Sequence, residues 1–269
     1  MKFESVRMLR YLRLYRVFFR NCLIREMGFR WNFIIRFTTE IVWLATSLIW
    51  FHVIYSYVRD VGGWTRYQYL FLIGVSYAIQ QTFESLLFVN CHRLSELIRT
   101  GELDFYLSRP INSQFLVSTR FVDLGGFANI FFGIGLAGFA WHKLSLPIHP
   151  GNLAMFVVLF LNGIIIYYVL MFSLMCLSFW IIRNESATGF FFQITELARQ
   201  PAEIYNYGIK VFLTFFFPMV VCINFPANVM VRSLSLPQFF YGIAVGLLLL
   251  YLSTLIWRVG LRSYSSASS

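Results

Sequence analysis

Three acidic side chains lie in or beside strongly apolar stretches of this 269-residue sequence: Glu40, Glu84 and Asp123. A charge at the centre of a bilayer costs about 2.5 to 3.5 kcal/mol on insertion scales, so such carboxylates either pair with a base or carry protons or cations. Arg36 precedes Glu40 by four residues, and Arg120 precedes Asp123 by three. This spacing favours local ion pairs, and ion transport is the alternative.

A second set of polar residues is concentrated in residues 91–114. Leu94 and Leu97 recur at helical spacing among charged residues, which predicts a short helix with one apolar and one polar face. Gly101 offers a left-handed C-cap, and Pro110 stops any further helix. We therefore expect a compact helical element whose polar groups are free to bind another protein.

Motifs for catalysis and for metal binding are absent from the sequence. A P-loop needs Lys followed by Ser or Thr, whereas Lys2, Lys143 and Lys210 are followed by Phe, Leu and Val. The four cysteines are far apart, and no His-Glu-x-x-His pair occurs. We predict no catalytic residue, metal site or cofactor in this chain, so any ATP hydrolysis requires a partner subunit.

The elements that hold these residues are predicted to be membrane-spanning helices. Hydrophobic residues make up 58% of the chain and charged residues only 13%, whereas about a quarter of a soluble domain is charged. Apolar runs long enough to cross about 30 Å of hydrocarbon recur along the chain. The sequence predicts an all-α polytopic membrane protein with six transmembrane helices, at residues 37–57, 67–89, 115–141, 153–182, 209–225 and 238–257.

The distribution of Lys and Arg predicts the orientation of these spans. With the N-terminus inside, the inner segments hold 18 basic residues and the outer segments four. The positive-inside rule then places both termini in the cytoplasm, in an integral protein of the plasma (inner) membrane. The expected organisation is a cytoplasmic helix over residues 1–36, a membrane domain over residues 37–257 and a cytoplasmic tail over residues 258–269.

The N-terminal helix is expected to lie on the membrane surface. Its basic residues recur every three to four positions among apolar ones, at Arg7, Arg10, Arg13, Arg16 and Arg20. Such a helix places cations against anionic lipid, although a solvated tail that obeys the positive-inside rule is the alternative. The net charge of +10 does not indicate nucleic-acid binding, because no soluble domain accompanies it.

Two features between the fourth and sixth spans carry structural predictions. Residues 190–200 alternate apolar and polar side chains at helical spacing, which predicts an interfacial helix or an extension of a neighbouring span. The fifth span is short and contains Pro218, with Pro226 just beyond it, so a kinked or partly re-entrant segment on the outer side is plausible.

The segment 91–114 resembles the coupling region of a type-2 ABC exporter permease, of the small six-span branch. The residues that carry the resemblance are Ile98, Arg99, Gly101, Leu103, Asp104, Leu107, Arg109, Pro110, Ile111 and Asn112. The basic N-terminal helix and the Phe-Pro pairs at 217–218 and 225–226 extend it more loosely over most of the chain. We refer to residues 91–114 as the coupling segment.

The resemblance implies a function and a set of partners. In that family the coupling segment inserts into a groove of a separate ABC ATPase subunit, which binds ATP and Mg²⁺, and the permease pairs with a second copy or a related permease. The residues that this assigns to coupling are Glu96, Arg99, Gly101, Asp104, Arg109 and Pro110. Alternatively, the segment only caps two spans, with Asp104 and Arg109 paired locally.

Two other functions remain open from the sequence. A membrane scaffold or assembly protein could use the coupling segment to recruit a cytoplasmic partner, and a secondary transporter could use the three intramembrane acids for ions. The transported substrate is not readable, since apolar cavity walls look like lipid-facing helices. Lipids, hydrophobic drugs, peptides and polysaccharides are all compatible with the sequence.

Overall fold

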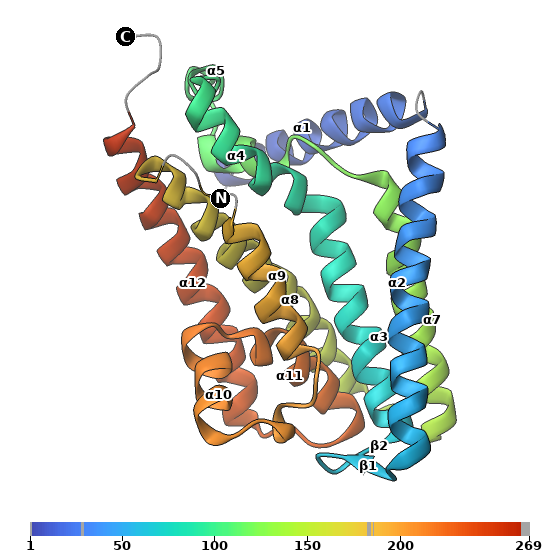
Figure 1. The fold of residues 1–269 in the computed structure, drawn as a ribbon. Coiled ribbons are helices and arrows are strands. Elements are labelled where there is room, and N and C mark those ends of the chain that lie inside the picture. Colours follow the sequence, from blue (N-terminus) through green and yellow to red (C-terminus); the bar gives the residue numbers. More distant parts are fainter. Residues whose placement is uncertain (1, 28–29, 182–183, 185, 265–269) are drawn as a thin grey trace.

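The chain forms a bundle of helices with two distinct ends (Figure 1). The computed structural model describes residues 2–27, 30–181, 184 and 186–264. Helix α1 (Lys2–Met27) lies across one end of the bundle, beside the short helix α5 (Asp104–Leu107). The opposite end carries a two-residue hairpin, in which β1 (Asp60–Val61) pairs antiparallel with β2 (Trp64–Thr65). We call these the α5 end and the hairpin end.

Most of the described residues are helical, as the composition predicts. Helices α3 and α4 are joined through a π-helical turn at Glu84–Phe88 into one apolar helix, Arg66–Thr100. The other helices are α2 (Arg30–Tyr57), α6 (Ser113–Thr119), α7 (Phe127–Leu144), α8 (Pro150–Cys176), α9 (Ser186–Ala198), α10 (Tyr207–Val211), α11 (Met219–Val231) and α12 (Leu236–Ser263).

Several of these helices are able to cross a membrane. Within the described residues, Arg66–Thr100, Leu124–Leu144, Pro150–Phe179 and Leu236–Ser263 are long and apolar enough to do so. A shorter apolar stretch, Ile41–Tyr57, lies in α2. The protein is therefore an all-α polytopic membrane protein, and the number of six spans stays a prediction.

The predicted third span begins too early. Residues 115–119 belong to α6, which ends before a short 3₁₀ turn at Leu124–Gly126, and α7 then starts at Phe127. The break occurs where the side chain of Asp123 accepts a hydrogen bond from the Gly125 amide (3.2 Å), which caps the turn. Because this polar capping starts a new helix, the apolar run from 115 to 141 is not one continuous helix.

Helices α3 and α7 pack with their backbones almost in contact, along small residues. A Cβ atom added to Gly74 would lie 2.5 Å from the Ala137 nitrogen, and one added to Gly133 would lie 2.7 Å from the Ala78 nitrogen. A side chain larger than hydrogen at either glycine would not fit without moving the neighbouring helix. Lipid is as apolar as the side chains, so close backbone packing of this kind holds membrane helices together.

Residues 186–203 run along the bundle rather than across its end, contrary to the predicted interfacial helix. Near the α5 end, Thr188 lies 3.3 Å from a ring nitrogen of His92. Further along, Phe192 packs on Phe88 with ring centroids 5.4 Å apart. At the hairpin end, the Trp64 indole donates to Glu203 at 2.8 Å. The contacts of α9 therefore move steadily along the Arg66–Thr100 helix from one end towards the other.

The predicted fifth span, residues 209–225, is a sharply bent pair of helices rather than one straight helix. The helices Tyr207–Phe216 and Met219–Val231 are bent by 96° at their junction, beside Pro218. Glu203 and Arg232, which flank the pair, form an ion pair of 3.2 Å at the hairpin end. The bend beside Pro218 confirms the kinked or partly re-entrant segment that the sequence predicted, and residues 203 and 232 on either side of the pair lie together at the hairpin end.

This path also changes the count of inner basic residues. Arg199 lies at the end of α9 inside the bundle, and Lys210 lies in α10, which follows from the hairpin end. The orientation argument counted both residues in an inner segment between the fourth and fifth spans. In the structure Arg199 contacts Gln80 of α3, and Lys210 belongs to the bent pair. The N-terminal cluster of nine basic residues and the four between the second and third spans still dominate the asymmetry.

Helix α1 has the amphipathic surface that its sequence predicts, as far as its side chains are described. Arg13, Arg16 and Arg20 are exposed, whereas Leu14 and Phe18 are half-buried against the bundle. Arg7 and Arg10 lie outside the side chains that the structure describes. The apolar face is tied to the coupling segment and the residues that follow it, because the ring of Tyr11 packs edge-on against Phe115 and Cys22 contacts the backbone at residues 120 and 122.

Candidate functional site

The coupling segment forms a rigid elbow at the α5 end. Helix α4 ends at Gly101, whose positive φ of 78° is the left-handed C-cap that the sequence predicts. The Leu103 amide then donates to the Leu97 carbonyl at 3.1 Å and closes the turn. Leu94, Leu97 and Leu103 are each at most 3% exposed. The predicted apolar face is therefore buried, and it fixes the direction in which the elbow points.

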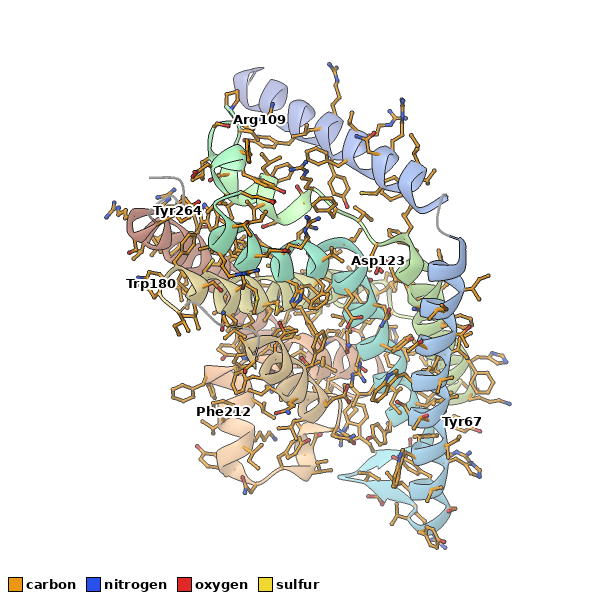
Figure 2. All side chains as sticks on the ribbon, turned by 45° about the horizontal axis from the view of Figure 1, so that its top comes forward. Tyr67, Arg109, Asp123, Trp180, Phe212 and Tyr264 are labelled. Carbon is orange, nitrogen blue, oxygen red and sulfur yellow. The ribbon has the colours of Figure 1, made fainter. Side chains whose placement is uncertain are left out.

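Most charged residues of the elbow are exposed, whereas Arg93 and Asp104 are half-buried. Glu96, Arg99, Arg109 and Pro110 are exposed. Figure 2 shows Arg109 at the α5 end, on the same side of the molecule as Tyr264. Arg109 makes no ion pair with any described residue, so the local Asp104–Arg109 pair of the alternative interpretation is not formed.

Asp104 is half-buried and belongs to the contact between the elbow and the end of α12. Burial and the neighbouring Asp104 carboxylate both raise the pKa of the Tyr264 hydroxyl.

Arg120 stacks on Tyr106 at 5.0 Å and on Phe121 at 5.4 Å. It does not form the ion pair with Asp123 that the sequence suggested. Aromatic packing and α12, rather than local ion pairs, hold the elbow in place.

Two of the three predicted intramembrane acids come together in space. Glu84 and Asp123 line a cavity of about 90 Å³ with Gln81 and Asn129. The Glu84 carboxylate accepts hydrogen bonds from the side-chain amides of Gln80 (2.7 Å) and Gln81 (3.3 Å). Glu40 lies in α2, and its side chain is outside the part that the structure describes. Each described acid is thus held by polar neighbours, which lowers the cost of its burial.

A hydrogen-bonded chain leads from this cavity across α3 to α9. Gln80 donates to Glu84 and accepts from the guanidinium of Arg199. Arg199 in turn forms an ion pair of 2.7 Å with Glu196, one turn earlier on α9. Arg199 and Glu196 were expected in an inner loop, where no such contact with α3 was foreseen. The fold brings a second pair of charges to about the middle of the Arg66–Thr100 helix.

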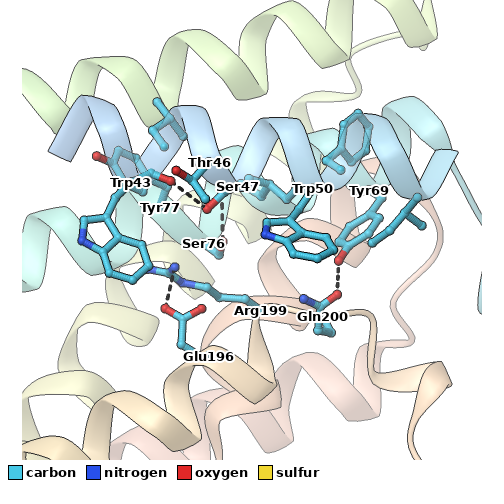
Figure 3. A pocket seen from close by; sticks show the side chains of 14 residues that line it. Trp43, Thr46, Ser47, Trp50, Tyr69, Ser76, Tyr77, Glu196, Arg199 and Gln200 are labelled. Atoms are coloured by element: carbon cyan, nitrogen blue, oxygen red, sulfur yellow. Dashed lines mark hydrogen bonds and ion pairs between the residues drawn. The ribbon is translucent and has the colours of Figure 1, made fainter. Parts of the chain in front are cut away.

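The Glu196–Arg199 pair opens into a groove of about 280 Å³ between α2, α3 and the end of α9 (Figure 3). Trp43 and Trp50 of α2 form one wall, and Tyr69 and Ser76 of α3 form another. The Tyr69 hydroxyl donates to the side-chain oxygen of Gln200. We refer to this as the α2–α9 groove.

The chain matches the family model described as ABC-2 family transporter protein, over residues 41–268. This is most of the sequence and includes the coupling segment, the α2–α9 groove and the bent pair. The chain belongs to the ABC-2 transporter family. Neither a curated protein nor a solved structure matches it. The protein is accordingly a membrane component of an ABC transporter, as the resemblance of its coupling segment implied.

The ABC-2 permease has one exposed site residue that the sequence analysis missed. Phe105 in α5 is 72% exposed, whereas its neighbours Leu103 and Tyr106 are buried. A large aromatic side chain that points into water at the tip of a rigid turn is typical of a protein contact. Phe105 belongs to a short mixed apolar and acidic run, residues 102–107, and the spacing within this run did not show which of its apolar side chains the fold covers.

Proposed function

We propose that this ABC-2 permease is the membrane subunit of an ATP-driven exporter, and that a separate ABC ATPase binds the tip of its coupling segment. The tip consists of the exposed side chains of Arg99, Phe105, Arg109 and Pro110. An exposed aromatic group flanked by guanidinium groups has the composition of a protein-binding hot spot. ATP and Mg²⁺ are bound by the ATPase, and this chain supplies no cofactor site.

One observation carries the coupling step of the proposal. The helix that ends at the elbow is continuous from Thr100 back to Arg66, beside the hairpin. A force on the tip therefore acts on a single element that reaches the other end of the bundle. Its π-helical turn at Glu84–Phe88 is the kind of irregularity that often accompanies function, and it lies beside the Glu84 cavity.

A second copy of the chain, or a related permease, completes the substrate route in this proposal. The α2–α9 groove is only partly enclosed, so one chain does not enclose a path. Helix α2 bears exposed apolar side chains near this groove, including Trp43, Ile49 and Trp50. Alternating access then comes from ATPase closure that moves the elbow and the Arg66–Thr100 helix, with export as the direction.

The experiment measures ATPase binding and coupled hydrolysis. The permease is purified in lipid nanodiscs with an ABC ATPase encoded beside it, and the variants Phe105→Ser and Arg109→Ala are compared with the unmodified chain. Loss of a hot-spot side chain typically removes about 2 kcal/mol of binding free energy, which is roughly a 30-fold loss of affinity. We expect a loss of this size for each variant, together with loss of permease-stimulated hydrolysis.

Arg262→Ala is the matched control, because Arg262 is also an exposed arginine near the α5 end but lies at the end of α12. This variant should bind and stimulate the ATPase normally. Unchanged affinity and unchanged stimulation in both tip variants would overturn the proposal. ATPase binding that depends on the tip without any stimulated hydrolysis would instead favour the scaffold function.

A further inference from the structure

The charged groups of the α2–α9 groove are not equally accessible. The Glu196 side chain is 59% exposed, whereas that of Arg199 is 19% exposed. Each terminal nitrogen of Arg199 makes one contact, to Glu196 and to the Gln80 side chain, and its Nε is buried with no hydrogen-bond partner among the described residues. The carboxylate of Glu196 uses one oxygen for Arg199, and its second oxygen has no partner among the described residues. A ligand in the groove therefore meets a carboxylate rather than a guanidinium.

Three hydroxyl groups of the groove also offer hydrogen-bond acceptors to a ligand, as the Glu196 carboxylate does. Thr46 donates its hydrogen to the Val42 carbonyl at 2.8 Å, and Ser47 donates to the Trp43 carbonyl at 3.0 Å. Ser76 donates to the Ile73 carbonyl at 2.9 Å. A hydroxyl has one hydrogen and two lone pairs, so these three present only lone pairs to a ligand. Neutral N–H groups remain on the indoles and on Gln200, and they do not alter the charge of the site.

Aromatic rings form the remaining wall of the groove. Trp43 and Trp50 are 64% and 65% exposed, and Figure 3 shows both on the side of the groove that faces Glu196 and Arg199. Indole faces attract cations, most strongly where water is excluded. Glu196 lies beside the middle of the apolar Arg66–Thr100 helix, where an exposed carboxylate is costly in lipid, so it faces a hydrated route or a ligand.

We infer that the α2–α9 groove binds organic cations, whose positive charge lies at the Glu196 carboxylate and whose aromatic or apolar body packs on Trp43 and Trp50. This inference rests on the proposed function, because the groove is taken as part of the substrate route. It adds the substrate class, which the sequence left open. The ligand requires only one positive charge and an apolar surface that fits a space of about 280 Å³, which is only partly enclosed.

The test uses two probes of the same shape and opposite charge. Tetraphenylphosphonium and tetraphenylborate are titrated into the purified full-length chain in nanodiscs by calorimetry, with protein-free nanodiscs as the blank. We expect the cation to bind more tightly than the anion. Glu196→Gln, which keeps an amide oxygen for Arg199, should weaken the cation about tenfold, as expected for loss of one partly screened charge contact. The affinity for the anion should not fall.

Two further variants make the result specific. Trp43→Leu should weaken the cation roughly fivefold through loss of a cation–π contact. Asp60→Asn, which removes an exposed carboxylate from the hairpin outside the groove, should leave both affinities unchanged. Preference for tetraphenylborate, equal binding of both probes, no binding of either, or an unchanged cation affinity in Glu196→Gln would overturn the inference.

The ATPase takes no part in this titration, so the two proposals can fail separately. If ATPase binding depends on the coupling tip but tetraphenylphosphonium does not bind, only the substrate class is wrong. If the cation binds at Glu196 but the tip variants bind and stimulate the ATPase normally, the proposed docking of the ATPase at the tip is wrong and the cation site stands.

Discussion

The elbow α4–α5 and helix α9 have similar patterns of apolar and charged residues, but they lie in different parts of the molecule. Each has an apolar stripe, several charged residues and a residue that stops the helix, Gly101 in one and Pro201 in the other. The elbow stays at the α5 end, where Ser95 bonds Ser178 at 2.7 Å. Helix α9 runs into the bundle, and Phe191 is fully buried between Phe83 and Tyr167.

This difference shows that an amphipathic pattern predicts which face of a helix is buried, but not whether the helix lies at one end of the bundle or inside it. The polar stripe of the elbow faces the predicted cytoplasm, whereas that of α9 includes Glu196 and Arg199, which line a groove inside the membrane domain. The position of the helix depends on which surface of the bundle is available to cover its apolar stripe. For α9 that surface is built from α3, α8 and α11, and no local signal in its sequence reports their arrangement.

The largest expected effect is the side from which cysteines are labelled. Tyr207→Cys, just after α9, should react with an impermeant maleimide in intact cells, and Ser186→Cys should react only in inverted vesicles. The reason is that residues 186–203 pass from the α5 end to the hairpin end. Arg99→Cys on the elbow is the control and should behave like Ser186→Cys. The four native cysteines are buried and should give little background. Labelling of residues 186 and 207 from the same side would contradict this path and support the predicted interfacial helix instead.

A smaller effect is expected when the contributions of the two regions to the free energy of unfolding are compared. Phe191→Ala should lower the free energy of unfolding by about 2 to 3 kcal/mol, because it leaves a cavity among packed aromatic rings, while lipid replaces part of the lost apolar contact. Phe105→Ala should change it by no more than about 0.5 kcal/mol, since Phe105 is 72% exposed. Unfolding by SDS in mixed micelles measures both. Equal losses for the two variants would mean that the tip is packed rather than exposed.

The smallest expected effect compares two glycines. Gly101→Ala should destabilise the protein by about 1 kcal/mol, because a side chain is strained at φ 78°. Gly189→Ala in α9 should instead stabilise it by about 0.5 to 1 kcal/mol, since alanine favours the helix and nothing lies within 4 Å of the new Cβ. The same SDS titration measures both changes. Changes of the same sign would show that one of the two backbone conformations is misassigned.

Much of the coupling site was predictable because its signals are local. The left-handed turn at Gly101, the buried stripe at Leu94 and Leu97 and the outward charges follow from spacing within about 20 residues. The exposure of Phe105 was not predicted, because it depends on where α6 and α12 leave the elbow uncovered. The groove was missed for a stronger reason, since α2 and α3 form it together with the end of α9, which lies more than 100 residues further along the chain.

The sequence by itself determined that this chain is an all-α membrane protein, that it lacks a P-loop motif, and that residues 91–114 form a helix that turns at Gly101. Composition, spacing and turn-forming residues act over short stretches of the chain, so they can be read directly from the linear sequence. Only the tertiary structure decided that residues 186–203 enter the bundle, that residues 207–231 turn back, and that Glu196 faces two tryptophans. These outcomes depend on competition among apolar surfaces for partners, and that competition is resolved only when the whole bundle packs.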